Sequence, residues 1–519
     1  MNRTKIIILL PLIALIAIAW YVRPLFHGYV MSIWIEPLGT VLMTAAAIAF
    51  ITAAVLYAKA YMRTKLGRPK RVNVLSYAVL LVIGALLLTG SAFYKAAASD
   101  LRYRQAYKAY TFEDTATLPA DQQSRLVPLP VAERFGADSL QRSTERAYSW
   151  HPQLWDGKFS WVTALVPNSP VRQWFDQARG VQVVDATTTQ RRSQTTEQAF
   201  KLSEGVQLAD NIRWQLYKQR YLVDLPEVYY AKVNDKVFAV APIISYRGWF
   251  IRYPIVDGAF VVAADGSIEE LNLERAKTHP AVVAAGRLYP ESYVRFVHES
   301  YAYKNGIINK WFRHVDQTEI SDPPGETNSQ PYMLATANGL AWVTAADPWG
   351  KSFGIYKVFI TNAITGRHQL YSVPQDAALT GAAQAIGYVK SARPQYNWRV
   401  DSSEQSSGSG NIIAIEPRPV FVQGQLYWMV SVTTTEAKGI NETCFVQAKD
   451  NQVTCATGDD EINSFIATAT LKPASAKPAP AAPGAPTTPA ADTKAKVDKL
   501  EATLRQALKE LEELKAAQP

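Results

Sequence analysis

Three apolar runs near the start of the chain set its predicted architecture. They cover Ile6–Val22, about Val30–Ala58 and Val72–Tyr94. Apolar runs of about 17 to 25 residues match the hydrocarbon thickness of a bilayer, so each is predicted to span it. The first run also fits a signal sequence, but the bulky residues Trp20–Pro24 follow it where cleavage needs small side chains. Residues 1–95 are therefore predicted to form a three-span membrane anchor.

A basic loop between the second and third runs predicts the orientation of the anchor. Loops rich in Lys and Arg stay in the cytoplasm, which places the N-terminus there and the chain after about Lys95 outside. The loop supplies much of the formal net charge of +9, which is therefore assigned to the bilayer surface rather than to a nucleic acid. Glu36, beside Pro37, falls close to the outer interface. The basic residues are Lys59, Arg63, Lys65, Arg68, Lys70 and Arg71.

Beyond the membrane, the pattern predicts a mixed region and then a mostly β region. Residues 96–194 combine a polar helical stalk, up to about Tyr110, with an irregular segment that contains prolines. Apolar residues at helical spacing predict a helix over Thr195–Arg220 and another over Pro290–Trp311. The rest of 195–471 is rich in Val, Ile, Tyr, Phe and Trp with turn residues between the runs, which is typical of strands.

One arrangement recurs three times in this β region. Each copy has an apolar strand, a connection, a second strand and an Asp, Asn or Gly turn into a return strand. The copies are either true repeats or similar by composition alone, because aromatic strands followed by turns resemble one another in any β domain. With the spans, they predict a membrane plus α+β protein whose extracytoplasmic domain is mostly antiparallel β with a few helices. The strand pairs are Val237–Val240 with Ala259–Ile268, Leu340–Val343 with Tyr356–Gly366, and Leu426–Val430 with Cys444–Cys455.

The C-terminal end has two segments of unlike composition. Residues 472–493 are dominated by Pro and Ala and are predicted to form an extended linker. Residues 494–519 carry apolar side chains at alternating steps of three and four, which predicts a short coiled-coil-like helix that pairs with itself or with a protein partner. A solvated amphipathic helix is the alternative. The seam comprises Val497, Leu500, Leu504, Ala507, Leu511 and Leu514.

The two cysteines bracket one predicted hairpin. A turn midway between Cys444 and Cys455 brings them opposite each other, which permits a disulfide in an oxidising compartment. Two buried thiols are the alternative. Neither cysteine belongs to a CxxC pair or lies near a histidine at metal-ligand spacing, so no zinc site is predicted.

Sequence motifs for catalysis and cofactor binding are not found. Trp349–Ser352 ends like a phosphate-binding loop, but Ala345 stands where its first glycine is required. The sequence has no GxSxG and no HExxH motif, and its six histidines are widely scattered. No catalytic residue, cofactor or metal site is therefore predicted.

Five short stretches of the β region follow one another in a recognisable order. They are Arg287–Tyr293, Gln330–Leu334, Gly354–Val358, Ser409–Ile415 and Gln425–Trp428. In order and spacing, and in the linker and charged helix that trail them, they resemble the C-terminal half of an uncharacterised family of large bacterial integral membrane proteins. The resemblance implies a multi-span envelope protein with an exported domain, and no activity or site residue. This chain departs from that family in having fewer spans and a much shorter exported part.

Together these observations predict a membrane-anchored extracytoplasmic scaffold or binding protein of the cell envelope. Its predicted contacts are the lipid bilayer and a protein partner, and not nucleic acid. A virus-encoded membrane or virion component uses the same parts and is one alternative. An envelope enzyme acting on sugars or peptides is another, and it requires acids that converge in a cleft.

Overall fold

The computed structural model describes residues 17–65, 74–119, 123–140, 144–320, 322, 329–350, 354–374, 377, 379–399 and 410–471. The chain divides into two compact parts, Met1–Thr470 and Leu471–Pro519. The predicted linker over 472–493 and the predicted helix over 494–519, with its seam from Val497 to Leu514, lie outside the described residues. Residues 6–16 of the first predicted span also lie outside them.

Two helices near the N-terminus are long and apolar enough to cross a membrane, and they are compatible with a membrane anchor. They are α3 (Pro37–Lys65) and α4 (Val74–Ala109), with candidate spans within Pro37–Met62 and Ser76–Ala109. The uncharged stretch of α4 ends before Lys95. Of the predicted basic loop, Lys59 and Lys65 lie at the end of α3. The side chain of Arg63 and the residues Arg68, Lys70 and Arg71 lie outside the described part.

The second predicted run is split into two helices. Residues 17–22 are helical and lead through the turn η1 (Arg23–Phe26) into α2 (His27–Ile35). The prediction of one segment from about Val30 to Ala58 is therefore wrong at its start. Pro37 has no N–H to continue the preceding helix and is favoured in the first turn of a new one, so α3 begins there.

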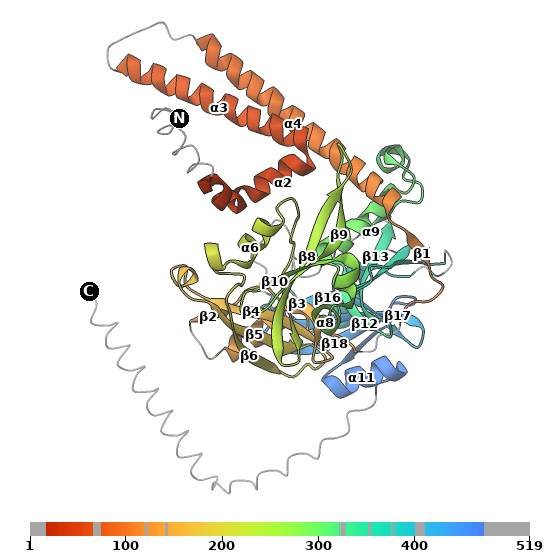
Figure 1. The fold of residues 1–519 in the computed structure, drawn as a ribbon. Helices are drawn as coiled ribbons and strands as arrows, with labels where there is room; N and C mark the ends of the chain where they lie inside the picture. The colour runs from red at the N-terminus through yellow and green to blue at the C-terminus, as the bar shows by residue number, and fades with distance from the viewer. Residues whose placement is uncertain are drawn as a thin grey trace, which may run out of the picture. The chain divides into compact units, whose positions relative to one another are not determined.

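α4 continues without a break from its apolar stretch through the predicted stalk. Its 36 residues correspond to about 54 Å at 1.5 Å per residue. α3 runs back along it, and the start of α3 lies against the middle of α4 (Figure 1). The Ser91 hydroxyl donates to the carbonyl of Gly39 at 2.7 Å, and Arg102 forms an ion pair with Glu36.

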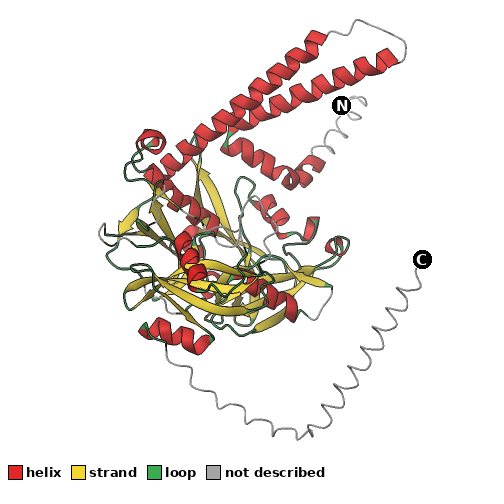
Figure 2. Ribbon diagram, turned by 180° about the vertical axis from the view of Figure 1, so that it is seen from behind, coloured by secondary structure: helices red, strands yellow, loops and turns green. Residues whose placement is uncertain are grey.

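The β-rich part is built from four meanders of antiparallel strands, visible in Figures 1 and 2. A helix precedes each meander, and we call each helix with its meander a unit. Unit 1 has α5 (Leu129–Ser139), β3 (His151–Trp155), β4 (Lys158–Pro167), β5 (Ala178–Asp185) and β6 (Ser193–Phe200). Unit 2 has α6 (Ile212–Gln219), β7 (Tyr229–Val233), β8 (Lys236–Arg247), β9 (Tyr253–Val262) and β10 (Ile268–Asn272). Unit 3 has α9 (Glu291–Ser300), β12 (Tyr332–Thr336), β13 (Gly339–Pro348), β14 (Lys357–Asn362) and β15 (His368–Ser372). Unit 4 has α10 (Ala382–Ala392), β16 (Ile412–Val422), β17 (Gln425–Thr434), β18 (Ile440–Gln447) and β19 (Val453–Ala456).

Short elements complete the units. The strands β1 (Phe112–Asp114), β2 (Glu145–Ala147) and β11 (Thr318–Glu319) pair with β15, β4 and β13. The helices α7 (Leu273–Thr278) and α8 (Pro280–Ala285) lie between units 2 and 3, and α11 (Asp459–Thr468) follows unit 4. The short 3₁₀-helices are η2 (Arg172–Trp174), η3 (Leu208–Asp210) and η4 (Tyr301–Tyr303), and η5 (Asn309–Arg313) is a π-helix. One cluster of buried apolar side chains joins units 1, 2 and 3 and another joins units 3 and 4, so the units share their cores.

The fold is α+β with mostly antiparallel sheets, as the sequence predicts. The three strand arrangements predicted from the sequence correspond to the second, third and fourth strands of units 2, 3 and 4. The prediction for Thr195–Arg220 is wrong in its first half, because β6 includes Ser193–Phe200 and only Ile212–Gln219 is α-helical. Threonine favours strands, and pairing with β5 satisfies the backbone of β6. The meander of unit 1 begins within residues 96–194, for which the sequence predicts a stalk and an irregular segment.

One alanine occupies the same position in every unit, directly after the third strand. In units 1, 3 and 4 its N–H donates to the carbonyl of the second residue of the second strand. Its carbonyl accepts an N–H from the segment that leads into the helix. For Ala363 these bonds run to Leu340 at 2.8 Å and from Leu288 at 2.7 Å. Ala186 and Ala448 repeat the pattern, whereas the N–H of Ala263 in unit 2 donates to Ser267.

A tryptophan completes the same contact in units 1, 3 and 4. It is the fourth residue of the second strand, and its indole N–H donates to the carbonyl two residues before the helix. The pairs are Trp161 with Val127 at 2.9 Å, Trp342 with Tyr289 at 2.9 Å and Trp428 with Thr380 at 2.7 Å. Ala239 takes this position in unit 2. The shared contacts show that units 1, 3 and 4 are structurally equivalent at this point, whereas the described residues of unit 2 lack both contacts.

Replacing Trp342 tests how much one of these contacts stabilises the fold. Trp342→Phe is expected to lower the free energy of unfolding by about 1–3 kcal/mol, because it removes a buried donor and leaves a small cavity. Urea unfolding of the full chain in detergent, followed by circular dichroism, measures the change. The control Trp249→Phe alters an exposed tryptophan and is expected to stay within about 0.5 kcal/mol. Equal losses in the two variants would refute the role given to the indole.

Candidate functional site

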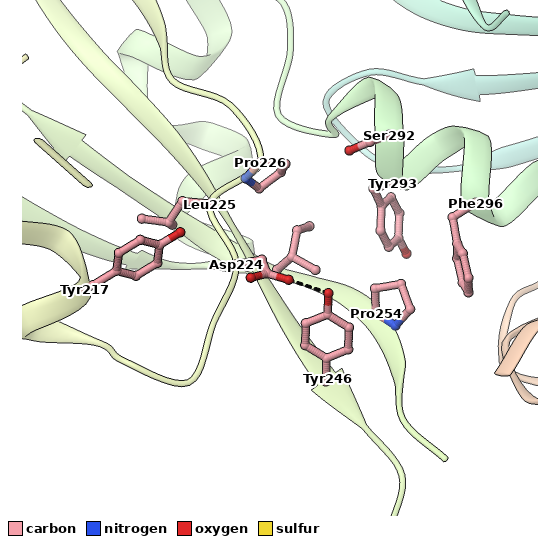
Figure 3. A pocket seen from close by; sticks show the side chains of 10 residues that line it. Tyr217, Asp224, Leu225, Pro226, Tyr246, Pro254, Ser292, Tyr293 and Phe296 are labelled. Atoms are coloured by element: carbon pink, nitrogen blue, oxygen red, sulfur yellow. Dashed lines mark hydrogen bonds between the residues drawn. The ribbon is translucent and has the colours of Figure 1, made fainter. Parts of the chain in front are cut away.

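A pocket of about 350 Å³ lies where unit 2 meets α9 of unit 3 (Figure 3). Pockets for small ligands usually enclose about 300–1,000 Å³, so this one suits a compact ligand. Its walls are mostly aromatic, aliphatic and proline side chains. The lining residues are Tyr217, Asp224, Leu225, Pro226, Ile244, Tyr246, Pro254, Ser292, Tyr293 and Phe296.

Asp224 brings the negative charge of this lining and is held in place by β8. Its backbone N–H donates to the carbonyl of Ile244, and its carbonyl accepts the N–H of Ile244, each at 2.9 Å. The hydroxyl of Tyr246 donates to its Oδ2 at 2.5 Å, the bond drawn in Figure 3. Burial, and then the charge of Asp224, raise the pKa of Tyr246. The hydroxyl therefore stays protonated and keeps orienting the carboxylate.

Residues from the N-terminal helices hold two walls of the pocket. The ring of His27 in α2 stacks on Tyr217 with their centroids 3.6 Å apart. On the other side, Tyr103 of α4 stacks on Phe296 of α9 at 4.6 Å. The pocket is thus fixed by the segments that lead into and out of the two apolar helices.

The lining defines which ligands this pocket can hold. Tyrosine, phenylalanine and proline faces accommodate an apolar or ring-shaped body, and phenolic hydroxyls can form hydrogen bonds at its edge. A carboxylate accepts charge-assisted hydrogen bonds, so it favours a ligand hydroxyl or amine. Among the described lining residues the carboxylate is that of Asp224, whereas hydrolysis of a glycosidic bond generally requires two acids.

The first strand of each unit is interrupted midway, and the interruption carries polar side chains into the interior. In unit 1, β2 and β3 are separate strands that both pair with β4, and in unit 3, β11 and β12 both pair with β13. In unit 2, an isolated bridge from Asp224 to β8 precedes β7. β16 has a bulge between Ile415 and Arg418. A proline adjoins a polar residue at each interruption. The pairs are His151–Pro152, Pro226–Glu227, Gln330–Pro331 and Glu416–Pro417.

Two buried ion-pair clusters form from these interruptions. Arg125 and Arg418 flank Glu416, with Arg125 at 2.5 Å and Arg418 at 3.9 Å. Arg287 pairs with Glu227 at 2.5 Å and also donates to the carbonyl of Pro152 at 2.9 Å, and His151 lies 3.7 Å from the same glutamate. Sequence spacing did not reveal either cluster. The recurring proline beside a polar residue was the signal available.

Two of the scattered histidines meet inside unit 3. His298 of α9 lies within 2.8 Å of the hydroxyls of Thr344 and Thr361, and Thr361 also lies 2.8 Å from His368. Burial lowers the pKa of both rings, to about 4 for His368. The neutral rings and hydroxyls satisfy one another, so this cluster is part of the core.

The structure places the two cysteines directly opposite each other on β18 and β19 and joins them in a disulfide. Glu442 also lies near their sulfur atoms. Because the sulfurs are bonded to each other, the group serves as a cross-strand link. It lies apart from the pocket, which is in units 2 and 3.

No protein-family model, curated protein or solved structure matches this chain.

The buried histidines predict a specific loss of stability in acid. An unfolded histidine has a pKa of about 6.5, so below that pH the unfolded state binds protons that folded His298 and His368 exclude. The free energy of unfolding is expected to fall as pH drops from 6.5 towards 4, with each ring contributing up to about 1.4 kcal/mol per pH unit. Urea unfolding at pH 7.5, 6 and 5 measures the slope.

The variant His298→Gln isolates one of these contributions. It is expected to make the slope shallower, whatever it does to stability at pH 7.5. His279→Gln changes a histidine outside the cluster and serves as the control. The same slope in the wild type and in His298→Gln would contradict the assignment.

Proposed function

We propose that the chain is a membrane-anchored extracytoplasmic binding protein of the cell envelope. Its ligand is a small molecule with an apolar body and a hydroxyl or amine donor. The observation that supports this is the pocket, in which aromatic walls surround a carboxylate that Tyr246 orients. Binding is favoured over hydrolysis because the described lining offers one acid rather than a facing pair.

Two features support the proposed location outside the cytoplasm. A structural disulfide such as Cys444–Cys455 persists in an oxidising compartment. The basic residues Lys59 and Lys65 lie in the last part of α3. This end of the helix extends away from the β-rich part (Figure 1), and a basic loop at that end is typical of the cytoplasmic side. The resemblance to exported domains of bacterial membrane proteins agrees with this placement. A protein partner or a second copy at the C-terminal helix stays part of the proposal.

Variants of the pocket test ligand binding directly. A panel of small ring-containing alcohols and amines is screened by thermal shift on the full chain in detergent. A ligand that raises the melting temperature is expected to bind about tenfold or more weakly to Asp224→Asn, because a charge-assisted hydrogen bond contributes about 1.5–3 kcal/mol. Tyr246→Phe is expected to weaken the same ligand, since the carboxylate loses its orienting donor.

Asp235→Asn is the matched control for the pocket variants. Asp235 lies in the exposed turn at the far end of β8, so its replacement should leave the affinity unchanged. Full affinity in both pocket variants would place the ligand elsewhere and overturn this site.

Labelling of intact cells tests the proposed orientation. The native cysteines are joined to each other, so a single introduced thiol reports its own exposure. Lys236→Cys, on the surface of unit 2, is expected to react with a membrane-impermeant maleimide in intact cells, because the β-rich part faces outward. Its reaction only after lysis would reverse the orientation.

A further inference from the structure

Two loops far apart in the sequence expose large aromatic side chains. The loop between β8 and β9 carries Trp249 and Phe250, which are 82% and 71% exposed. In and before η5, Ile308 and Phe312 are 67% and 75% exposed, and Trp311 lies between them. We call these five residues the aromatic rim. Clusters of this kind on a protein surface mark a contact with a membrane or another molecule.

Each loop is attached to the helices that lead into the predicted membrane anchor. The indole N–H of Trp311 donates to Asp100 of α4 at 2.8 Å. In the other loop, the guanidinium of Arg252 lies 3.8 Å from the centre of the Trp34 ring, just before α3, and donates to the carbonyl of Trp34. The orientation of both loops is therefore tied to the helix hairpin.

The two attachment points lie at the same level along that hairpin. Glu36, two residues after Trp34, forms an ion pair with Arg102, two residues after Asp100. The start of α3 therefore faces the turn of α4 that holds the second loop. Both parts of the rim accordingly flank one short section of α4.

That section lies just beyond the apolar part of α4. Lys95 is the first charged residue after the apolar stretch, and Asp100 follows about 7.5 Å further along at 1.5 Å per residue. The headgroup layer of one leaflet is about 5–7 Å thick. The rim is therefore at the height where lipid headgroups meet water.

The residues around the rim have the composition of a membrane interface. Tryptophan and phenylalanine are joined by the basic residues Arg247, Arg252, Lys310 and Arg313. Amphipathic aromatic rings are enriched at headgroup level, and basic side chains there are attracted to lipid phosphates. This combination fits a phospholipid surface.

We infer that the aromatic rim inserts into the headgroup layer of the outer leaflet and docks the β-rich part on the bilayer. This inference rests on the membrane anchor of the proposed function. It also places the ligand pocket, because Tyr246 lies three residues before Trp249, a distance of about 10 Å along an extended chain. The pocket is then held beside the lipid surface, within reach of amphiphilic ligands.

Spin labels on the full chain test this docking. Single variants Phe250→Cys and Phe312→Cys are labelled with a nitroxide and reconstituted in vesicles of phosphatidylcholine and phosphatidylglycerol. The accessibility of each label to oxygen and to a water-soluble nickel chelate is measured by power saturation. Both positions are exposed, so the substitutions are expected to leave folding intact.

Two further variants calibrate the measurement. Leu86→Cys marks the apolar part of α4, where the leucine is exposed. Lys236→Cys marks the opposite end of β8, about 36 Å from Arg247 along the strand. The ratio of oxygen to nickel accessibility at 250 and 312 is expected to be roughly threefold or more above that at 236, because the polar chelate is excluded from the interface.

The outcomes separate the docking from the anchor on which it rests. If the accessibility ratio at positions 250 and 312 equals that at position 236, while the label at position 86 is embedded in lipid, the docking would be overturned and the anchor left intact. The rim would then be free for a protein partner. A label at 86 that is open to the chelate would overturn the anchor, and with it both proposals.

Discussion

In units 1, 3 and 4 the hydrogen bonds of one buried alanine determine how closely the helix approaches its sheet. In units 1, 3 and 4 this alanine is fully buried and bonds on one side to the second strand and on the other to the segment before the helix. A larger side chain there would push these segments apart, since buried positions are closely packed. The nearby tryptophan donates to the same segment. The apolar face of the meander and the apolar face of the helix are thus buried against each other in one core.

The interrupted first strands introduce charges into that core, and the charges link the units. A buried charge is costly unless it is paired. Arg125, before unit 1, pairs with Glu416 of unit 4, and Arg287, before unit 3, pairs with Glu227 of unit 2. Each guanidinium therefore has its partner only when neighbouring units are correctly arranged. The helix α11, which follows unit 4, also contacts unit 1, because its residue Asp459 accepts the N–H of Thr189 at 2.7 Å.

The same packing ties the β-rich part to α4. The stacked rings of Tyr103 and Phe296 connect α4 to α9, and Phe296 also lines the pocket. A rigid connection has a functional consequence, because the pocket and the aromatic rim keep a constant distance from the apolar helices. This rigid arrangement supports the proposed capture of a ligand at a lipid surface.

The sequence by itself determined the features that depend on neighbouring residues. Apolar length indicated α3 and α4, alternation and turn residues indicated the strands of units 2, 3 and 4, and cysteine spacing placed Cys444 opposite Cys455. The split at Pro37 follows from a local property of proline, which the apolar pattern alone did not include. Only the tertiary structure decided the strand β6 and the meander of unit 1, because pairing with neighbouring strands outweighs local helical spacing. It alone assembled the pocket and the ion pairs. Asp224, Pro254 and Tyr293 are separated by tens of residues, and no local pattern records which distant side chains they meet.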